Sequence, residues 1–233
     1  MHNFQTNLFP EATLEIKPLK KIDVKSFKDT FLQHFWGYKH DIVTAFDDFL
    51  TIQICLFARQ TQEELYLQTV KKYDRDDLDK FANITARMWT EYYLAKDKNE
   101  WIDPLGELYE EITSRHKSSK MGQFFTPPSL CNLIATMTMD PENFNLKIND
   151  PACGSGRMLL ACEKVSKGNF LYGADLDNMC AKMSAINCCM HFHKAEIWHG
   201  DTLANKYFKV YIVNFDYRKS KTPSIFIKHQ TPN

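Results

Sequence analysis

A short stretch rich in small residues constrains the fold of this chain more than any other part of its sequence. Residues 150–156 read Asp-Pro-Ala-Cys-Gly-Ser-Gly, between a strand-like run at residues 146–149 and a helix-like run at residues 157–164. Glycines let a backbone approach a ligand closely, and the unpaired N–H groups at a helix N-terminus attract anions. The stretch therefore predicts a strand–turn–helix unit that holds a nucleotide-like ligand.

Strand-like and helix-like segments alternate around this unit. We expect strands near residues 146–149, 170–174, 195–198 and 208–213, and helices near residues 127–139, 155–167 and 177–193. Such alternation is typical of a parallel sheet with helices on both faces. Further upstream, apolar residues at helical spacing predict helices near residues 42–59, 77–96 and 104–114. We therefore expect an α/β, Rossmann-like domain over residues 121–233, preceded by a mostly helical region over residues 1–120.

Acidic side chains are expected at the ends of the first two strands. Asp150 ends the first strand, and Asp175 ends the second, 19 residues after Gly156. A carboxylate at the second position can accept hydrogen bonds from both hydroxyls of a ribose. Asp177 is the competitor for that role, but it is better placed to cap the next helix. An NAD-binding domain is the main competing interpretation. Its Gly-x-Gly-x-x-Gly motif requires a third glycine at the position where this chain has Leu159.

Three further stretches accompany residues 150–156 in the chain. Residues 122–128 read Gly-Gln-Phe-Phe-Thr-Pro-Pro, residues 172–177 read Tyr-Gly-Ala-Asp-Leu-Asp, and residues 199–203 read His-Gly-Asp-Thr-Leu. Together these stretches resemble amino-group DNA methyltransferases, and in particular the modification subunits of type I restriction–modification systems, which methylate adenine at N6. The resemblance covers about residues 102–217, and it implies the fold and the S-adenosylmethionine (SAM) cofactor of that family.

The resemblance also implies roles for three acids. Asp150 would pair with the ammonium group of SAM, and Asp175 would bind the ribose hydroxyls. Asp201 matches the family residue that accepts a hydrogen bond from the adenine amino group.

Other positions of the family site lie on the loop and upstream of it. The backbone around Ala152, Gly154 and Gly156 would approach the methionine part of SAM. Phe125 and Thr126 match residues that pack on the methionine end and hydrogen-bond to it. Thr126 is also expected to cap the helix that follows.

The acceptor site is less complete than the cofactor site. In the family, the fourth strand ends in Asn or Asp, followed by two prolines and an aromatic residue that stacks on a flipped base. Here the strand at residues 208–213 is followed by Asn214-Phe215-Asp216-Tyr217. We therefore expect Asn214 to orient the target amino group and Tyr217 to stack on the base. Both prolines are absent, so an ordinary turn is the competing interpretation.

The chain continues for only 16 residues beyond Tyr217. No target-recognition domain fits there, so we expect DNA and a separate specificity or modification subunit as partners. Two alternatives to an N6-adenine DNA methyltransferase remain open. One is a SAM-binding module or partner subunit with impaired catalysis, and the other is a methyltransferase that acts on protein glutamine or another amino group.

Composition excludes several other classes. The formal net charge is zero, although residues 204–233 hold six Lys or Arg and one acid. The seven cysteines show no paired zinc spacing. The chain has no Pro-Cys pair, which cytosine-C5 methylation usually requires. It also shows no signal peptide and no apolar stretch long enough to span a membrane. We expect a cytoplasmic protein with reduced thiols, no metal and no membrane partner.

Overall fold

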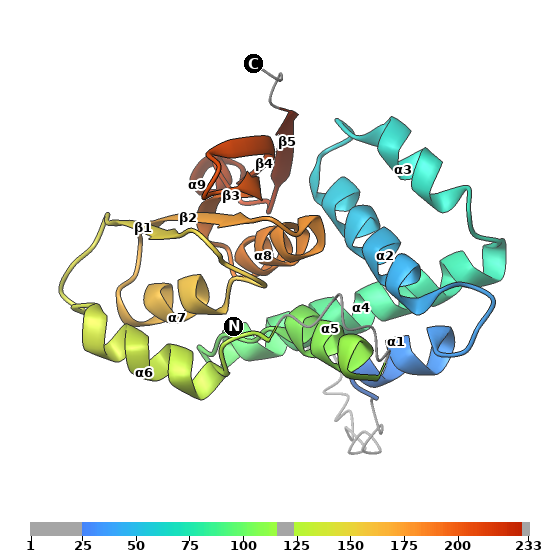
Figure 1. The fold of residues 1–233 in the computed structure, drawn as a ribbon, viewed down its shortest axis with the longest axis horizontal. Coiled ribbons are helices and arrows are strands. Elements are labelled where there is room, and N and C mark those ends of the chain that lie inside the picture. The colour runs from blue at the N-terminus through green and yellow to red at the C-terminus, as the bar shows by residue number, and fades with distance from the viewer. Residues whose placement is uncertain (1–24, 116–123, 230–233) are drawn as a thin grey trace, which may run out of the picture.

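Helices occupy the first half of the chain. The computed structural model describes residues 25–115 and 124–229 (Figure 1). Residues 25–115 contain α1 (Phe27–Phe35), α2 (Ile42–Phe57), α3 (Glu63–Val70), α4 (Arg75–Asp97) and α5 (Pro104–Arg115). The three helices predicted in this region are confirmed as α2, α4 and α5, each within two residues of its expected ends.

Aromatic side chains hold these helices together. Phe27, Phe31 and Phe35 recur every four residues on α1 and are completely buried, because that spacing places them on one face of the helix. The Phe31 ring packs on that of Phe49 in α2, with centroids 5.8 Å apart. The Phe35 ring stacks on that of Phe81 in α4 at 4.7 Å. These rings belong to an apolar core that continues from the helices into α8 and the sheet.

A five-stranded sheet follows the helices. Its elements are α6 (Pro128–Thr138), β1 (Lys147–Asp150), α7 (Arg157–Val165), β2 (Phe170–Asp175), α8 (Asn178–Met190), β3 (Lys194–Asp201), β4 (Lys206–Val213), α9 (Tyr217–Ser220) and β5 (Ile225–His229). The strand order is β1-β2-β3-β4-β5. The α/β architecture with N-terminal helices is confirmed.

The sheet is mixed, whereas a parallel sheet was expected. β1, β2 and β3 are parallel to one another, but β4 pairs antiparallel with β3, and β5 pairs antiparallel with β4. The physical reason is the short connection between β3 and β4, which spans only residues 202–205. A parallel return needs a crossover of about a dozen residues or more, whereas a short turn reverses the chain.

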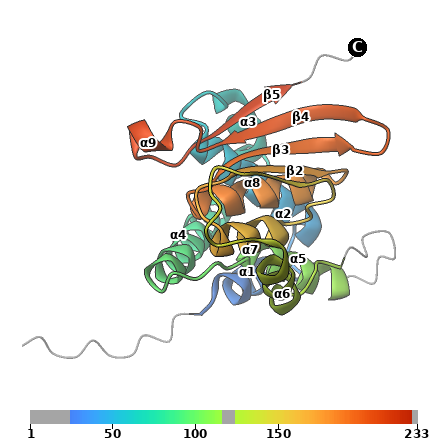
Figure 2. The same cartoon turned by 90° about the vertical axis from the view of Figure 1, so that its left-hand side faces the viewer.

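The helices between the parallel strands lie on one face of the sheet. Figures 1 and 2 show α7 and α8 beneath β1, β2 and β3. The strands advance in one direction across the sheet, so right-handed crossovers place both helices on the same side. On the other face, Phe170, Tyr172 and Trp198 are only partly buried. Helices on both faces were expected, and the described residues do not have that arrangement.

Two predicted caps have different outcomes. The Asp177 carboxylate accepts a hydrogen bond from Met179 N–H at 2.7 Å and caps α8, as expected. The expectation that Thr126 caps α6 is wrong. Pro127 occupies the N-cap position, with no side-chain hydrogen bond, and Pro128 begins the helix. Proline suits this place because its missing N–H has no partner there in any case.

Candidate cofactor site

The loop between β1 and α7 requires glycine at two positions. Gly154 has φ +52° and Gly156, the N-cap of α7, has φ +91°. A Cβ on Gly154 would lie 2.8 Å from the ring of Phe125, and one on Gly156 would lie 2.7 Å from Ser184 Oγ. The positive φ angles and the close neighbours explain why small residues occupy this loop.

Asp175 at the end of β2 ties the loop to the sheet. Its Oδ2 accepts a hydrogen bond from Gly154 N–H at 2.9 Å, and its Oδ1 accepts one from Asp177 N–H at 2.8 Å. Burial raises the pKa of Asp175, although the two N–H donors act in the opposite direction. Each carboxylate oxygen keeps a second lone pair. Asp175 can therefore hold the loop and still accept hydrogen bonds from a ligand.

Asp150 at the end of β1 has a similar environment. Its Oδ1 accepts a hydrogen bond from Ala152 N–H at 3.1 Å. Burial raises the pKa of Asp150, and the nearby charge of Asp175 adds to the effect. A cationic ligand group would offset both penalties on the ionised carboxylate. Asp150 is therefore suited to pair with an ammonium group.

A hollow of about 400 Å³ opens beside this loop, at the carboxyl ends of β2 and β3. Five of the residues predicted to bind the cofactor line it together: Phe125, Ala152, Gly154, Asp175 and Asp201. Thr126, Asp150 and Gly156 belong to the surrounding loops and do not line it. The hollow is within the size range of small-ligand pockets, about 300–1,000 Å³.

The two leucines of this hollow were missed in the sequence. Leu176 follows the Asp175 carboxylate and is 64% exposed, and Leu203 follows Thr202 and is fully exposed. Exposed leucines beside polar groups are suited to pack on the face of a flat ring. A leucine within two residues of Asp175 and of Asp201 was the signal for them. Thr202 also helps to close the hollow, because its Oγ1 donates to Pro151 O at 2.9 Å.

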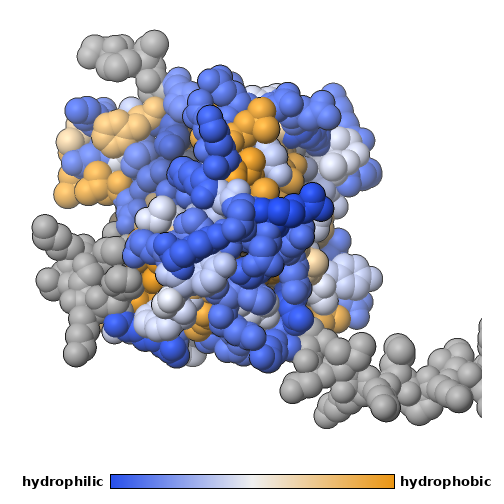
Figure 3. All heavy atoms as spheres, turned by 90° about the vertical axis from the view of Figure 1, so that its right-hand side faces the viewer, coloured by the Kyte–Doolittle hydropathy of each residue, from blue (hydrophilic) through white to orange (hydrophobic). Residues whose placement is uncertain are grey.

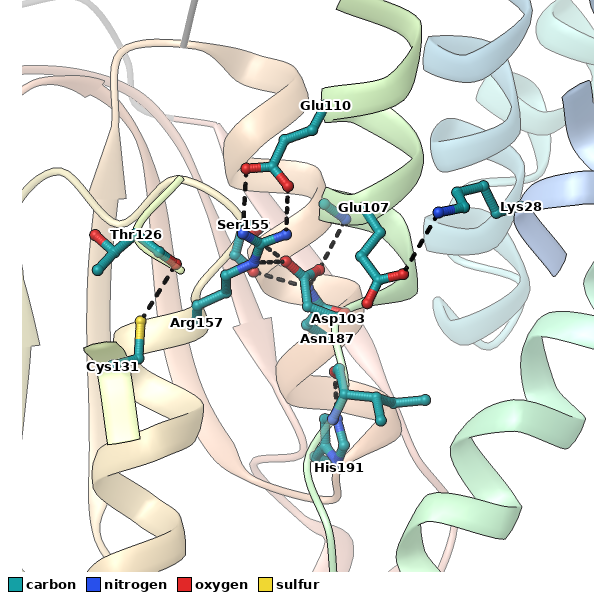
Figure 4. Close-up of polar contacts among 12 residues, drawn as sticks. Lys28, Asp103, Glu107, Glu110, Thr126, Cys131, Ser155, Arg157, Asn187 and His191 are labelled. Atoms are coloured by element: carbon teal, nitrogen blue, oxygen red, sulfur yellow. Dashed lines mark hydrogen bonds and ion pairs between the residues drawn. The ribbon is translucent and has the colours of Figure 1, made fainter. Parts of the chain in front are cut away.

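A buried polar network supports the loop from beneath. Asp103 accepts hydrogen bonds from Ser155 Oγ at 2.5 Å, Arg157 Nε at 2.6 Å and Asn187 Nδ2 at 2.7 Å (Figure 4). Arg157 also reaches Glu110 on α5 at 2.9 Å. The network therefore joins the helical region, the glycine loop and α8. The sequence did not reveal it, because its members come from three distant segments.

Asn214 and Tyr217 lie at the opposite end of the strands from this hollow. Because β4 is antiparallel to β3, its last residue, Val213, pairs with Ala195 near the start of β3. Asn214 is 3% exposed, and its side chain binds backbone: Oδ1 accepts from Ser224 N–H at 3.0 Å, while Nδ2 donates to His193 O at 3.0 Å. The expectation that β4 delivers these two residues to the cofactor is not met.

The fold therefore places a strand, a glycine turn and a helix beside a hollow at the carboxyl ends of β2 and β3. Residues 100–223 match the family described as N-6 DNA Methylase. This match covers more than half of the chain, and the chain belongs to that family.

The chain is similar to subunits of type I restriction enzymes. It is 30% identical over 131 residues to the MjaVII methylase subunit of Methanocaldococcus jannaschii, covering 52% of this chain and 22% of that subunit. It is 28% identical over 130 residues to the MpnII methylase subunit of Mycoplasma pneumoniae, covering 51% of this chain and 24% of that subunit. The matched part thus spans less than a quarter of each relative.

Among solved structures, the chain is similar to the type I restriction–modification methyltransferase subunit of Streptococcus thermophilus. The identity is 18% and the TM-score is 0.37, with 76% of this chain and 57% of that chain covered. In the part of the chain that the structure describes, no helix has both the length and the apolar character needed to cross a membrane.

Proposed function

We propose that this chain binds SAM and forms the cofactor-binding part of an N6-adenine DNA methyltransferase. The observation that carries the proposal is the bridge from Asp175 to Gly154 N–H at 2.9 Å, beside a hollow at the carboxyl ends of β2 and β3. Ligands of open α/β sheets bind at that edge. Membership in the N-6 DNA methylase family supports the same reaction class.

The residues present fit each part of SAM. Because Gly154 has no Cβ, Phe125 can stay close to the loop at the edge of the hollow. Asp150 would take the ammonium group and Asp175 the ribose hydroxyls, while Leu176 and Leu203 would pack on the adenine. Asp201 would accept from the adenine amino group, and its Oδ1 already accepts from Ala204 N–H at 2.9 Å.

The remaining predicted residues would serve the methionine end. Phe125 stacks on Tyr109 with centroids 5.4 Å apart, so its ring is held in place beside the loop. Thr126 follows it, exposed, and the backbone of Ala152 and Gly156 would complete the cradle. When bound, SAM supplies a methyl group on a positively charged sulfur. The chain's own contribution is to bind and orient that group at one edge of the sheet.

The acceptor-binding residues would lie outside residues 25–115 and 124–229. The side chain of Asn214 is hydrogen-bonded to Ser224 N–H and His193 O at the other end of the strands. It is therefore not available to orient an adenine amino group beside SAM. We therefore favour the SAM-binding module over a self-sufficient enzyme. DNA and a separate modification or specificity subunit are the partners that this role requires.

Calorimetric titration with SAM tests the proposal. Wild-type protein should bind SAM, and Asp175→Ala should weaken binding at least tenfold, since it removes about 1.5–3 kcal/mol of charged hydrogen bonding. Glu196→Gln, on β3 away from the hollow, is the control and should bind normally. Absence of SAM binding by the folded wild-type chain would overturn the proposal.

A methyl-transfer assay separates the module from the complete enzyme. With labelled SAM and mixed-sequence DNA, the chain alone should transfer no label. The double substitution Phe215→Pro and Asp216→Pro should not create activity, because Asn214 would remain at the far edge. Label in adenine that disappears in Asn214→Ala would instead identify a complete enzyme.

A further inference from the structure

Exposed aromatic side chains gather at the sheet edge opposite the glycine loop. A hollow of about 630 Å³ lies between the end of α2, the second half of α4 and the turn after α8. Trp89 and Tyr93 of α4 line it and are 40% and 70% exposed, and Phe192 closes its other side. Single exposed rings are ordinary, whereas a contiguous patch of them points to a ligand or a partner.

A second hollow of about 340 Å³ adjoins the first and shares Phe192 with it. Phe215, which is 63% exposed, and Tyr217 line this second hollow. The rings of Phe192 and Tyr217 have centroids 5.2 Å apart, so the aromatic surface is continuous. We call the set Trp89, Tyr93, Phe192, Phe215 and Tyr217 the aromatic track.

Positive charges accompany both parts of the track. Lys96 Nζ lies 3.8 Å from the centroid of the Phe192 ring, and Lys194 Nζ lies 4.7 Å from that of Phe215. Arg218 lines the second hollow, and Lys219 follows it on the exposed side of α9. Within residues 25–115 and 124–229, none of these four cations forms an ion pair. They are therefore available to an anionic ligand.

Two acids at the second hollow are already engaged. Asp216 pairs with Arg59 at 2.7 Å. Glu163 accepts hydrogen bonds from Gly168 N–H at 2.6 Å and Asn169 N–H at 3.1 Å. Because these two carboxylates are satisfied by the protein, they do not pair with the lysines and the arginine of the track.

We propose that the aromatic track binds single-stranded nucleic acid. Aromatic rings that stack on bases, next to cations that contact phosphates, are what sequence-tolerant single-strand binding requires. A mononucleotide would need one ring surface and one cation, whereas here two adjoining hollows each have both. The ligand chemistry is therefore a chain of at least two nucleotides with exposed bases.

The surroundings favour a nucleic acid over a protein partner. Figure 3 shows that the face carrying α2 and α3 is mostly hydrophilic, with hydrophobic patches in its upper part. The cations beside the rings favour a polyanion over an apolar protein surface. Figure 2 shows α9 at one end of the strands and the β3–β4 turn at the other. The track and the cofactor hollow are thus at different edges, and this inference does not depend on SAM binding.

Fluorescence anisotropy of a labelled oligothymidine tests the inference. The full chain should bind a strand of about 12 nucleotides saturably at low salt, with a Kd of about 1–100 μM. Tyr93→Ala and Phe215→Ala should each weaken binding roughly tenfold, since each removes a stacking surface. Leu94→Ala, at an exposed apolar position on the same helix that does not line the track, should leave binding unchanged.

Salt dependence supplies a second readout. Lys96→Gln combined with Arg218→Gln should lower the slope of log K against log salt by about 1.4, or about 0.7 for each lost phosphate contact. Lys71→Gln, an exposed lysine at the end of α3, should leave the slope unchanged. Lack of saturable binding by the wild-type chain would overturn the inference. Equal binding by Tyr93→Ala, Phe215→Ala and wild-type protein would do so as well.

Discussion

Arg157 Nε donates to Asp103 Oδ2 at 2.6 Å and joins the first residue of α7 to the residue just before α5. Both side chains are at least 95% buried. Burial raises the pKa of Asp103, and the charge of Arg157 opposes that effect. The Arg157 guanidinium therefore lies against the Asp103 carboxyl inside the protein, and the same carboxyl also holds Ser155 of the glycine loop.

The first prediction concerns this buried pair. Arg157→Met should lower the free energy of unfolding by about 3–5 kcal/mol, because it leaves the Asp103 carboxylate buried without a cation. Urea denaturation measures the change. Arg115→Gln breaks an exposed ion pair with Glu111 and should cost less than about 1 kcal/mol. Similar small losses for the two variants would show that the buried pair does not stabilise the junction.

The second prediction concerns the glycine loop. Gly154→Ala should weaken SAM binding at least tenfold, because its Cβ would displace Phe125, 2.8 Å away, from the edge of the hollow. Gly168→Ala is a matched control, since Gly168 also has positive φ but has no atom within 4 Å of its Cβ position. Both variants carry a backbone strain of about 1–2 kcal/mol. Only Gly154→Ala should change the SAM affinity measured by titration.

The third prediction distinguishes a structural Asn214 from a catalytic one. Asn214→Ala should reduce the free energy of unfolding by about 1–3 kcal/mol, because Ser224 N–H loses its side-chain acceptor inside the protein. Its SAM affinity should remain that of the wild type. Asn83→Ala, at an exposed position on α4, should change stability by no more than about 0.5 kcal/mol. An unchanged stability for Asn214→Ala would contradict the structural role.

The fourth prediction concerns pH. Burial, and secondly the neighbouring His191, lower the pKa of His193 from 6.5 to about 3. Between these values the unfolded chain binds a proton at this position and the folded chain does not, so stability falls as the pH falls below 6.5. The loss should approach about 1.4 kcal/mol per pH unit.

Urea titrations at pH 7, 6 and 5 would measure that slope. His193→Gln removes the titrating ring, so its stability should depend less steeply on pH than that of the wild type. Parallel curves for the two proteins would show that His193 is protonated equally in the folded and unfolded states.

The predicted elements were mostly correct where local chemistry decides them. α2, α4 and α5 follow from the spacing of their apolar residues, and the Asp177 cap follows from its position before α8. The loop at residues 150–156 was expected between a strand and a helix, and it lies there. In each case the residues that determine the structure are neighbours in the chain.

Contacts between distant segments were not predictable in the same way. The Asp103–Arg157 pair spans 54 positions, and no local pattern marks its partners. The Thr126 cap failed because Pro128 began α6 and left Pro127 as the N-cap. The roles expected for Asn214 and Tyr217 came from the family's motif after the fourth strand, and the antiparallel β4 places both residues away from the cofactor hollow.

The sequence by itself determined the strand, the glycine turn and the helix that would hold a nucleotide-like cofactor, together with the acids at the ends of β1 and β2. These features depend on backbone freedom, caps and hydrogen bonds within a few residues. Only the tertiary structure decided on which edge of the sheet Asn214 lies. That choice depends on the strand with which β4 pairs and on its direction, and residues 202–205 are too few to return the chain parallel to β3.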